Sequence, residues 1–169
     1  MPKKVRTLQY YNCRFALIFT GMLILSSGVL CSSQPEYSAE NTTPSDEISV
    51  FIAGDAIITQ PWSHINEPEF LKLIDDVRSA DIAAVNLEML IHDFEAYPSA
   101  NSGGTWMAAR PKIAQELKWA GFDMVSNANN HSFDYGTIGV LKTVEHIEKA
   151  GIKIAGVGKD LQRASAPVY

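Results

Sequence analysis

Short apolar runs alternate with amphipathic segments from residue 48 to the end of the chain. The runs are rich in β-branched residues, which predicts buried strands over residues 48–53, 82–85, 122–126 and 152–155. Between them, apolar residues recur at helical spacing, which predicts helices over residues 66–80, 111–120 and 137–150. Asn66 and Glu69 are expected to cap the first helix. This alternation predicts an α/β fold, in which helices cover a parallel sheet.

The first 31 residues have a different pattern. Basic residues precede the apolar run Phe15–Leu25, and the small residues Ser26 to Gly28 follow it. This order predicts a signal peptide or membrane anchor over residues 1–31. A cleaved signal, a retained anchor and a lipid attached at Cys31 all remain open. Each alternative predicts export or membrane attachment, with the rest of the chain outside the cytoplasm at the cell membrane or cell surface. Where the segment is retained, residues 1–31 would contact the membrane.

The charge of the chain is divided unequally. Residues 1–34 hold four bases and no acid, whereas the remainder holds ten bases and nineteen acids, within a formal net charge of −5. The excess of acidic residues after residue 34 argues against nucleic-acid binding through phosphate contacts. Residues 32–47 are polar, contain two prolines and predict a linker. The predicted organisation is therefore signal or anchor, linker, and one domain over residues 48–169.

Polar side chains follow three of the predicted strands. Asp55 follows the first strand, Asn86 and Glu88 follow the second, and a third group follows the next: Asn129, Asn130 and His131. In parallel sheets, functional residues gather beyond the carboxyl ends of the strands. Oxygen ligands with one imidazole suit Mg²⁺, Mn²⁺ or Zn²⁺ at a hydrolytic site.

These residues also have purely structural interpretations. Asp55 could form a turn, and the Asn-Asn-His run could satisfy loop backbone groups. Asp134 either begins a turn or orients His131. The other three histidines are expected at the surface, namely His64, His92 and His146.

Three segments resemble the CapA-like family of poly-γ-glutamate capsule synthesis proteins. They are Gly54-Asp55, the run ADIAAVNLE at 80–88 and the run GFDMVSNANNHSFDYG at 121–136. The resemblance extends from about residue 48 to Tyr169. It implies the αββα sandwich of the calcineurin-like metallophosphoesterases, here incomplete, as the N-terminal half of the domain cut at the start of a strand.

The resemblance also implies roles for individual residues. Asp55, Glu88 and Asn130 correspond to metal ligands, and His131 to the catalytic histidine that assists the leaving group. Asn86, Asn129 and Asp134 would support them. Two features depart from the wider pattern: Ile57 stands where a histidine is usual, and no later histidine motif occurs before Tyr169.

Two functions follow from the resemblance. The first is a metal-dependent hydrolase or transferase of capsule or poly-γ-glutamate biosynthesis, acting on a phosphoester or a γ-glutamyl amide. The alternative is a non-catalytic cell-envelope component that assists polymer synthesis or export. In both, the expected partner is an anionic envelope polymer or its synthesis machinery. An acidic body favours a local cation over broad surface contact with such a polymer.

Overall fold

The computed structural model describes residues 5–6, 48–102 and 104–169. The predicted signal or anchor and the linker therefore lie outside the described residues, apart from Val5 and Arg6. Within the described part of the chain, no helix is long and apolar enough to cross a membrane.

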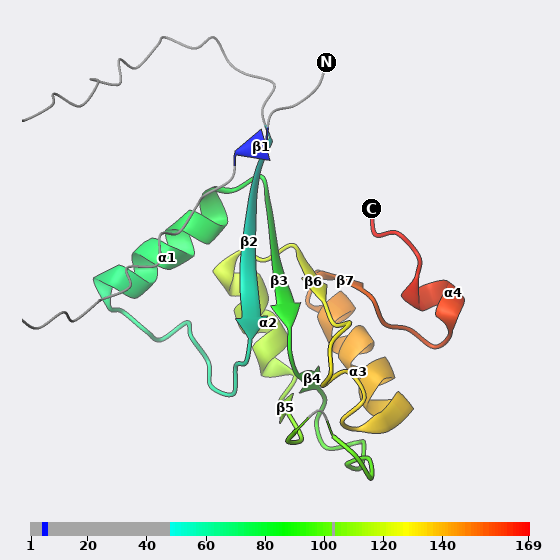
Figure 1. Cartoon of the computed structure of the whole chain (residues 1–169). Helices are drawn as coiled ribbons and strands as arrows, with labels where there is room; N and C mark the ends of the chain where they lie inside the picture. Colours follow the sequence, from blue (N-terminus) through cyan, green and yellow to red (C-terminus); the bar gives the residue numbers. More distant parts are fainter. Residues whose placement is uncertain (1–4, 7–47, 103) are drawn as a thin grey trace, which may run out of the picture.

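A five-stranded parallel sheet forms the centre of the protein (Figure 1). Its strands stand in the order β1 (Val5–Arg6), β2 (Ile48–Ala56), β3 (Ile82–Leu87), β6 (Met124–Ser126) and β7 (Lys153–Ala155). The strands after β2 are connected through α1 (Pro68–Ser79), α2 (Lys112–Ala120) and α3 (Gly136–Lys149). The predicted α/β class with a parallel sheet is confirmed.

The hydrophobic core lies on one face of this sheet. Ala83, Val85 and Leu87 are buried there against apolar residues of α1, α2 and α3. On the opposite face Ile52 is 78% exposed and Ile82 is 39% exposed. Strand residues alternate between faces, so only one face is covered by the described residues. The second large sheet of an αββα sandwich is not among those residues.

The helix boundaries differ slightly from the predicted ones. The N-cap position of α1 is Glu67, whose side chain forms no capping hydrogen bond. The Asn66 side chain, which was expected to cap the helix, instead donates to the His64 carbonyl. Proline fits the first helical turn because it needs no N–H partner, and Pro68 accordingly begins the helix. The predicted end of α2 is confirmed, because Gly121 takes a left-handed φ of 105° after the helix.

Besides β1, three short elements were not predicted. They are β4 (Leu90–Ile91) and β5 (Ala108–Ala109), which pair in parallel, and α4 (Leu161–Ala164). Elements of two to four residues are too short to show a hydrophobic period. The expected start of a strand at residues 166–169 is wrong, since that segment forms no regular structure.

Candidate functional site

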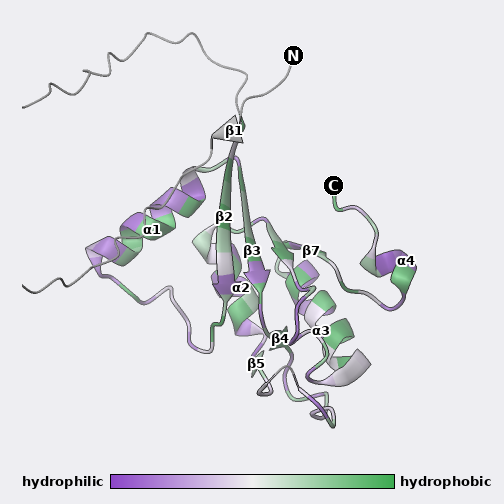
Figure 2. Ribbon diagram, viewed as in Figure 1, coloured by the Kyte–Doolittle hydropathy of each residue, from purple (hydrophilic) through white to green (hydrophobic). Residues whose placement is uncertain are grey.

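The register of β2 against β3 places Asp55 beside Asn86. Ile52 pairs with Ala84 and Asp55 pairs with Asn86, so three steps along β2 match two steps along β3. The extra residue is a β-bulge. In a regular strand, Ile52 and Asp55 would point to opposite faces; the bulge brings Asp55 to the open face shared with Asn86. In Figure 2 the arrows of β2 and β3 accordingly become hydrophilic at their carboxyl ends.

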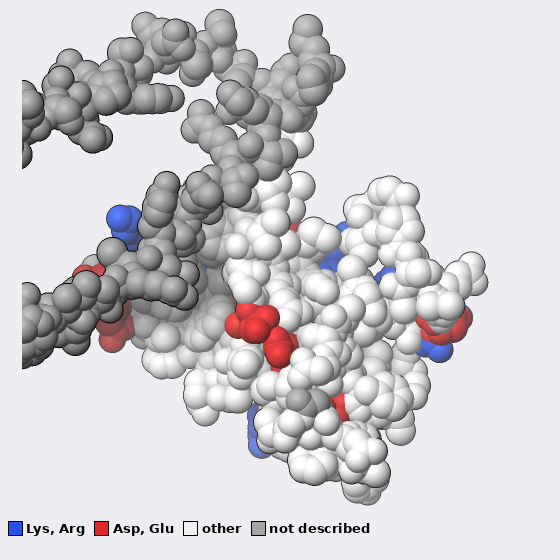
Figure 3. Space-filling view, viewed as in Figure 1, with Lys and Arg blue, Asp and Glu red and all other residues white. Residues whose placement is uncertain are grey.

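Asn86 connects the two carboxylates at this edge. Its Nδ2 donates to Asp55 Oδ1 at 2.8 Å and to Glu88 Oε2 at 3.0 Å. Its Oδ1 accepts from Asn129 Nδ2 at 3.1 Å. The two hydrogens of one amide therefore serve two carboxylates, and the network fixes the amide orientation. We call Asp55, Asn86 and Glu88 the acidic cluster. Figure 3 shows acidic side chains on the surface over the carboxyl end of β2, the strand that contains Asp55.

The two carboxylates of the acidic cluster titrate together. Hydrogen bonds with Asn86 and then with Glu88 hold the pKa of Asp55 below its usual value. The hydrogen bond with Asp55, burial and the charge of Asp55 raise the pKa of Glu88, against smaller opposing effects of His131 and Asn86. Adjacent like charges disfavour double ionisation, so Glu88 keeps its proton longer than an isolated glutamate does. A cation between them would relieve this repulsion.

The loop after β6 contributes Asn129 through local hydrogen bonds. Asn129 Nδ2 also donates to the Leu87 carbonyl at 2.9 Å, and its Oδ1 accepts from the His131 N–H. Fully buried Asn127 donates to the carbonyls of Leu87 and Met89 at 2.6 and 3.3 Å. Both asparagines thus tie this loop to the end of β3, where the acidic cluster lies.

His131 is held by Asp134. His131 Nδ1 lies 2.8 Å from Asp134 Oδ2, which also accepts from the Met107 N–H at 2.8 Å. His131 is 5% exposed and Asp134 is fully buried. Because a carboxylate oxygen only accepts, Nδ1 carries the hydrogen, leaving Nε2 as the ring atom able to accept a proton. The predicted orientation of His131 by Asp134 agrees with this contact.

Most of the predicted site residues lie close together in the structure. Asp55, Asn86, Glu88 and Asn129 form one hydrogen-bonded network, while His131 acts electrostatically on Glu88. Asn130 is exposed in the same loop, between Asn129 and His131. Among the described residues, no three His, Cys, Asp or Glu side chains are placed to hold one metal ion. Carboxylate oxygens are the kind of donor that divalent cations prefer, and Asp55 and Glu88 supply two such groups side by side.

Two asparagines hold the site residues in place. Asn86, which the sequence predicts as a supporting residue, bonds both carboxylates, whereas Asn127 was not selected from the sequence. Asn127 was detectable by the same signal that selected Asp55 and Asn86, namely a polar residue at the carboxyl end of a buried strand.

Residues 49–169 match the family model of the bacterial capsule synthesis protein PGA_cap. The chain belongs to this family. It is 34% identical over 124 residues to the uncharacterized protein y4sH of Sinorhizobium fredii, covering 72% of this chain and 27% of that protein. It is also 27% identical over 95 residues to the capsule biosynthesis protein CapA of Bacillus anthracis, covering 55% of this chain and 23% of the relative.

A longer match connects the chain to the PGA biosynthesis protein CapA of Bacillus subtilis. The two are 22% identical over 171 residues, covering 98% of this chain and 44% of the relative. The chain spans about a quarter of the length of y4sH and less than half of the length of either CapA protein. The resemblance inferred from residues 54–55, 80–88 and 121–136 is thus confirmed at the level of the family.

Proposed function

We propose that this chain is the N-terminal part of an exported capsule biosynthesis protein whose acidic cluster binds a divalent metal ion. The observation that carries the proposal is the pairing of Asp55 with Glu88 through the single amide of Asn86. Two carboxylates held together, Asp55 exposed and Glu88 half-buried, form an incomplete set of oxygen donors for Mn²⁺, Zn²⁺ or Mg²⁺. The proposed substrate is a phosphoester or γ-glutamyl bond formed during poly-γ-glutamate synthesis.

Asp55 and Glu88 would hold the metal, and exposed Asn130 is the proposed third ligand from the neighbouring loop. When bound, the metal would polarise the oxygen of the bond to be cleaved. Asn86 holds both carboxylates in a fixed orientation, so the cation does not have to orient them when it binds. Asn129 in turn fixes Asn86.

His131 is the proposed proton donor to the leaving group. Asp134 holds Nδ1, which orients the ring and leaves Nε2 to receive a proton and pass it on. The charge of His131 already lowers the pKa of Glu88, so the two side chains are electrostatically coupled. Such a histidine beside a metal-binding pair is suited to the hydrolysis or transfer of an ester or amide.

The wider setting of the site is part of the same proposal. Residues 1–31 would export the protein or attach it to the membrane, with lipid attachment at Cys31 as one route. The open face of the sheet, with Ile52 78% exposed, supports an αββα sandwich that is completed by a second sheet. An anionic envelope polymer or its synthesis machinery would then reach the acidic cluster through the bound cation.

Calorimetric Mn²⁺ titration of the full chain tests the proposal. We expect Asp55→Asn and Glu88→Gln each to weaken Mn²⁺ binding by about tenfold or more, because each removes one anionic ligand. The matched control is Asp75→Asn, which removes the same charge from an exposed position on α1 and should change the affinity by less than about twofold. An Mn²⁺ affinity that is unchanged in both Asp55→Asn and Glu88→Gln would refute the metal site.

The second candidate is a non-catalytic envelope component. It is favoured by the lack of a three-residue His, Cys, Asp or Glu group among the described residues. If Mn²⁺ does not bind, while a reporter fused after Tyr169 still requires residues 1–33 for its activity outside the cytoplasm, this candidate replaces the first.

A further inference from the structure

A cavity of about 330 Å³ lies between the segments that follow β2 and β4 and the segment from β5 into α2. Its wall includes Thr59 and Gln60 after β2, His92 after β4, and Arg110 and Lys112 at the start of α2. None of the described residues that line it is acidic. It therefore differs in charge from the acidic cluster.

The cavity lies within reach of the two carboxylates. Thr59 follows Asp55 by four residues, and His92 follows Glu88 by four. Four extended residues span at most about 14 Å. The segments also run side by side, because the Ile58 N–H donates to Met89 Sδ at 3.4 Å. One elongated substrate could contact both places at once.

Two basic side chains at the cavity form no ion pair with a described acidic residue. Arg110 and Lys112 are exposed, and neither forms an ion pair with a described acid. The Arg110 guanidinium lies over the Phe94 ring, 5.6 Å from its centroid, which positions the side chain without removing its charge. Lys112 acts on Glu116, but that carboxylate accepts hydrogen bonds from the N–H groups of Trp62 and Ser63.

A buried histidine, His92, also lines the cavity. The expectation that His92 lies at the surface is wrong, since the residue is 1% exposed. Its Nδ1 accepts from the Phe94 N–H at 3.1 Å, so in the neutral ring the hydrogen is on Nε2. Burial lowers the pKa of His92, which favours this neutral form. Nε2 has no hydrogen-bond partner among the described residues, and such an orphan donor calls for an acceptor.

We propose that this cavity binds an oxyanion, the carboxylate or phosphate group of the substrate whose reacting bond lies at the acidic cluster. The assignment of the oxyanion to that substrate rests on the proposed function. The exposed side chains of Arg110 and Lys112 supply charge, Thr59 and Gln60 supply polar groups, and buried His92 completes the lining. The cation at one end and the anion site at the other would fix the direction in which the substrate binds.

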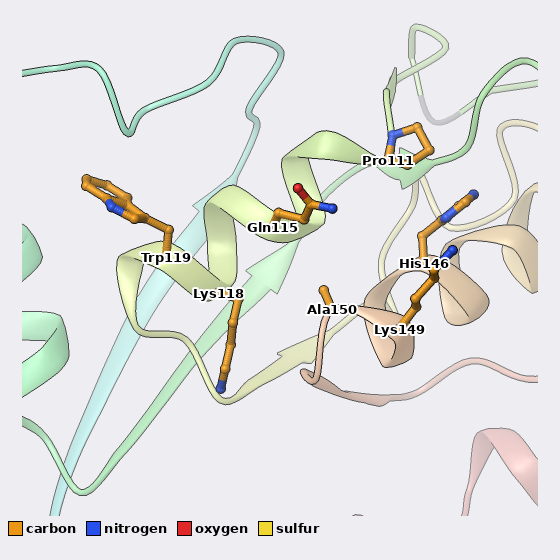
Figure 4. A pocket seen from close by; sticks show the side chains of 7 residues that line it. All are labelled: Pro111, Gln115, Lys118, Trp119, His146, Lys149 and Ala150. Carbon is orange, nitrogen blue, oxygen red and sulfur yellow. The ribbon is translucent and has the colours of Figure 1, made fainter.

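Calorimetric titration of the full chain with inorganic phosphate and with a γ-glutamyl tripeptide tests this site. We expect the double variant Arg110→Gln/Lys112→Gln to lose about tenfold or more in affinity for the tighter of the two probes. The matched control is Lys118→Gln/Lys149→Gln, which removes two lysines from the separate groove between α2 and α3 (Figure 4). This control should keep its affinity within about twofold.

The two probes distinguish the source of the oxyanion. Tighter phosphate binding identifies a phosphate group, and tighter peptide binding identifies a carboxylate; either result supports the site. Binding by neither probe overturns it. Equal losses in both double variants also overturn it, because net charge alone would then account for the binding.

Mn²⁺ titration separates this inference from the proposed function. Arg110→Gln/Lys112→Gln should retain the Mn²⁺ affinity of the unmodified chain, and Asp55→Asn should retain its affinity for the oxyanion probe. If Mn²⁺ fails to bind while the Arg110/Lys112-dependent oxyanion binding persists, the metal proposal fails and the oxyanion site stands.

Discussion

Asn86 Nδ2 lies 2.8 Å from Asp55 Oδ1, and this contact joins the ends of two neighbouring parallel strands. The same nitrogen donates to Glu88, two residues further along the chain. One neutral amide thereby holds two carboxylates that would otherwise repel each other. The pKa values of the two carboxyl groups are nevertheless shifted in opposite directions: the bond from Asn86 lowers the pKa of Asp55, whereas the bond with Asp55, burial and the Asp55 charge raise that of Glu88, so Asp55 ionises first.

Replacing Asn86 should raise the pKa of Asp55. The hydrogen bond from Asn86 is the largest cause that lowers this pKa, so Asn86→Ala removes the main stabilisation of the Asp55 carboxylate. Carbon-13 NMR titration of the side-chain carboxyl groups measures the change. Asn66→Ala is the control, because the exposed Asn66 side chain donates to the His64 carbonyl and forms no bond with the acidic cluster. An unchanged Asp55 titration in Asn86→Ala would show that the bond has no electrostatic effect.

Glu116→Gln should reduce stability at neutral pH and flatten its dependence on acid. Glu116 is 4% exposed and accepts from the Trp62 and Ser63 N–H groups at 2.9 and 2.7 Å. Burial alone would raise its pKa, but bonds from Ser63 and Trp62 lower it below the usual 4.5. A carboxylate with a lowered folded pKa stabilises the fold above its unfolded pKa and loses that effect as pH falls through the folded pKa.

Urea denaturation between pH 7 and pH 3 measures this effect. At pH 7 the variant should lose about 1–3 kcal/mol, the usual result of weakening a buried hydrogen-bonded charge. The difference from the unmodified chain should shrink as the pH falls below 4.5. Glu69→Gln, at an exposed position in the first turn of α1, should change stability by no more than about 0.5 kcal/mol. A pH-independent difference would contradict the role given to the Glu116 charge.

Gly156→Ala should loosen the loop that carries Asn129 and His131. Gly156 has a φ of 85°, and a Cβ there would lie 2.5 Å from Ala128 Cβ. Both the backbone conformation and the contact disfavour a side chain, at a cost of about 1–3 kcal/mol. Hydrogen exchange of residues 127–131 would follow the expected loss of protection.

Gly151→Ala separates the two causes. Gly151 shares a left-handed φ of 77°, but a Cβ there meets nothing within 4 Å. It should therefore destabilise the chain less and leave exchange in residues 127–131 unchanged. Equal effects of both variants would assign the loss to backbone strain alone.

The sequence predicted the repeating units of the fold because each rests on a local signal. The apolar runs 82–85 and 152–155 lie within or largely overlap β3 and β7, and Gly121 ends α2 as expected. The strands β4 and β5 carry no such signal, because each has only two residues and forms a strand only by pairing with the other. His92 looked like a surface residue because its burial depends on β4, which places it beside the Tyr135 ring at 4.5 Å between centroids.

The sequence by itself determined which side chains reach the carboxyl edge of the sheet. Asp55, Asn86 and Asn129 each follow or end an apolar run, and parallel strands bring such ends together. Only the tertiary structure decided which of them touch. The extra residue between Ile52 and Asp55 changes the face on which Asp55 lies, and a register shift of this kind depends on pairing with β3 rather than on local pattern.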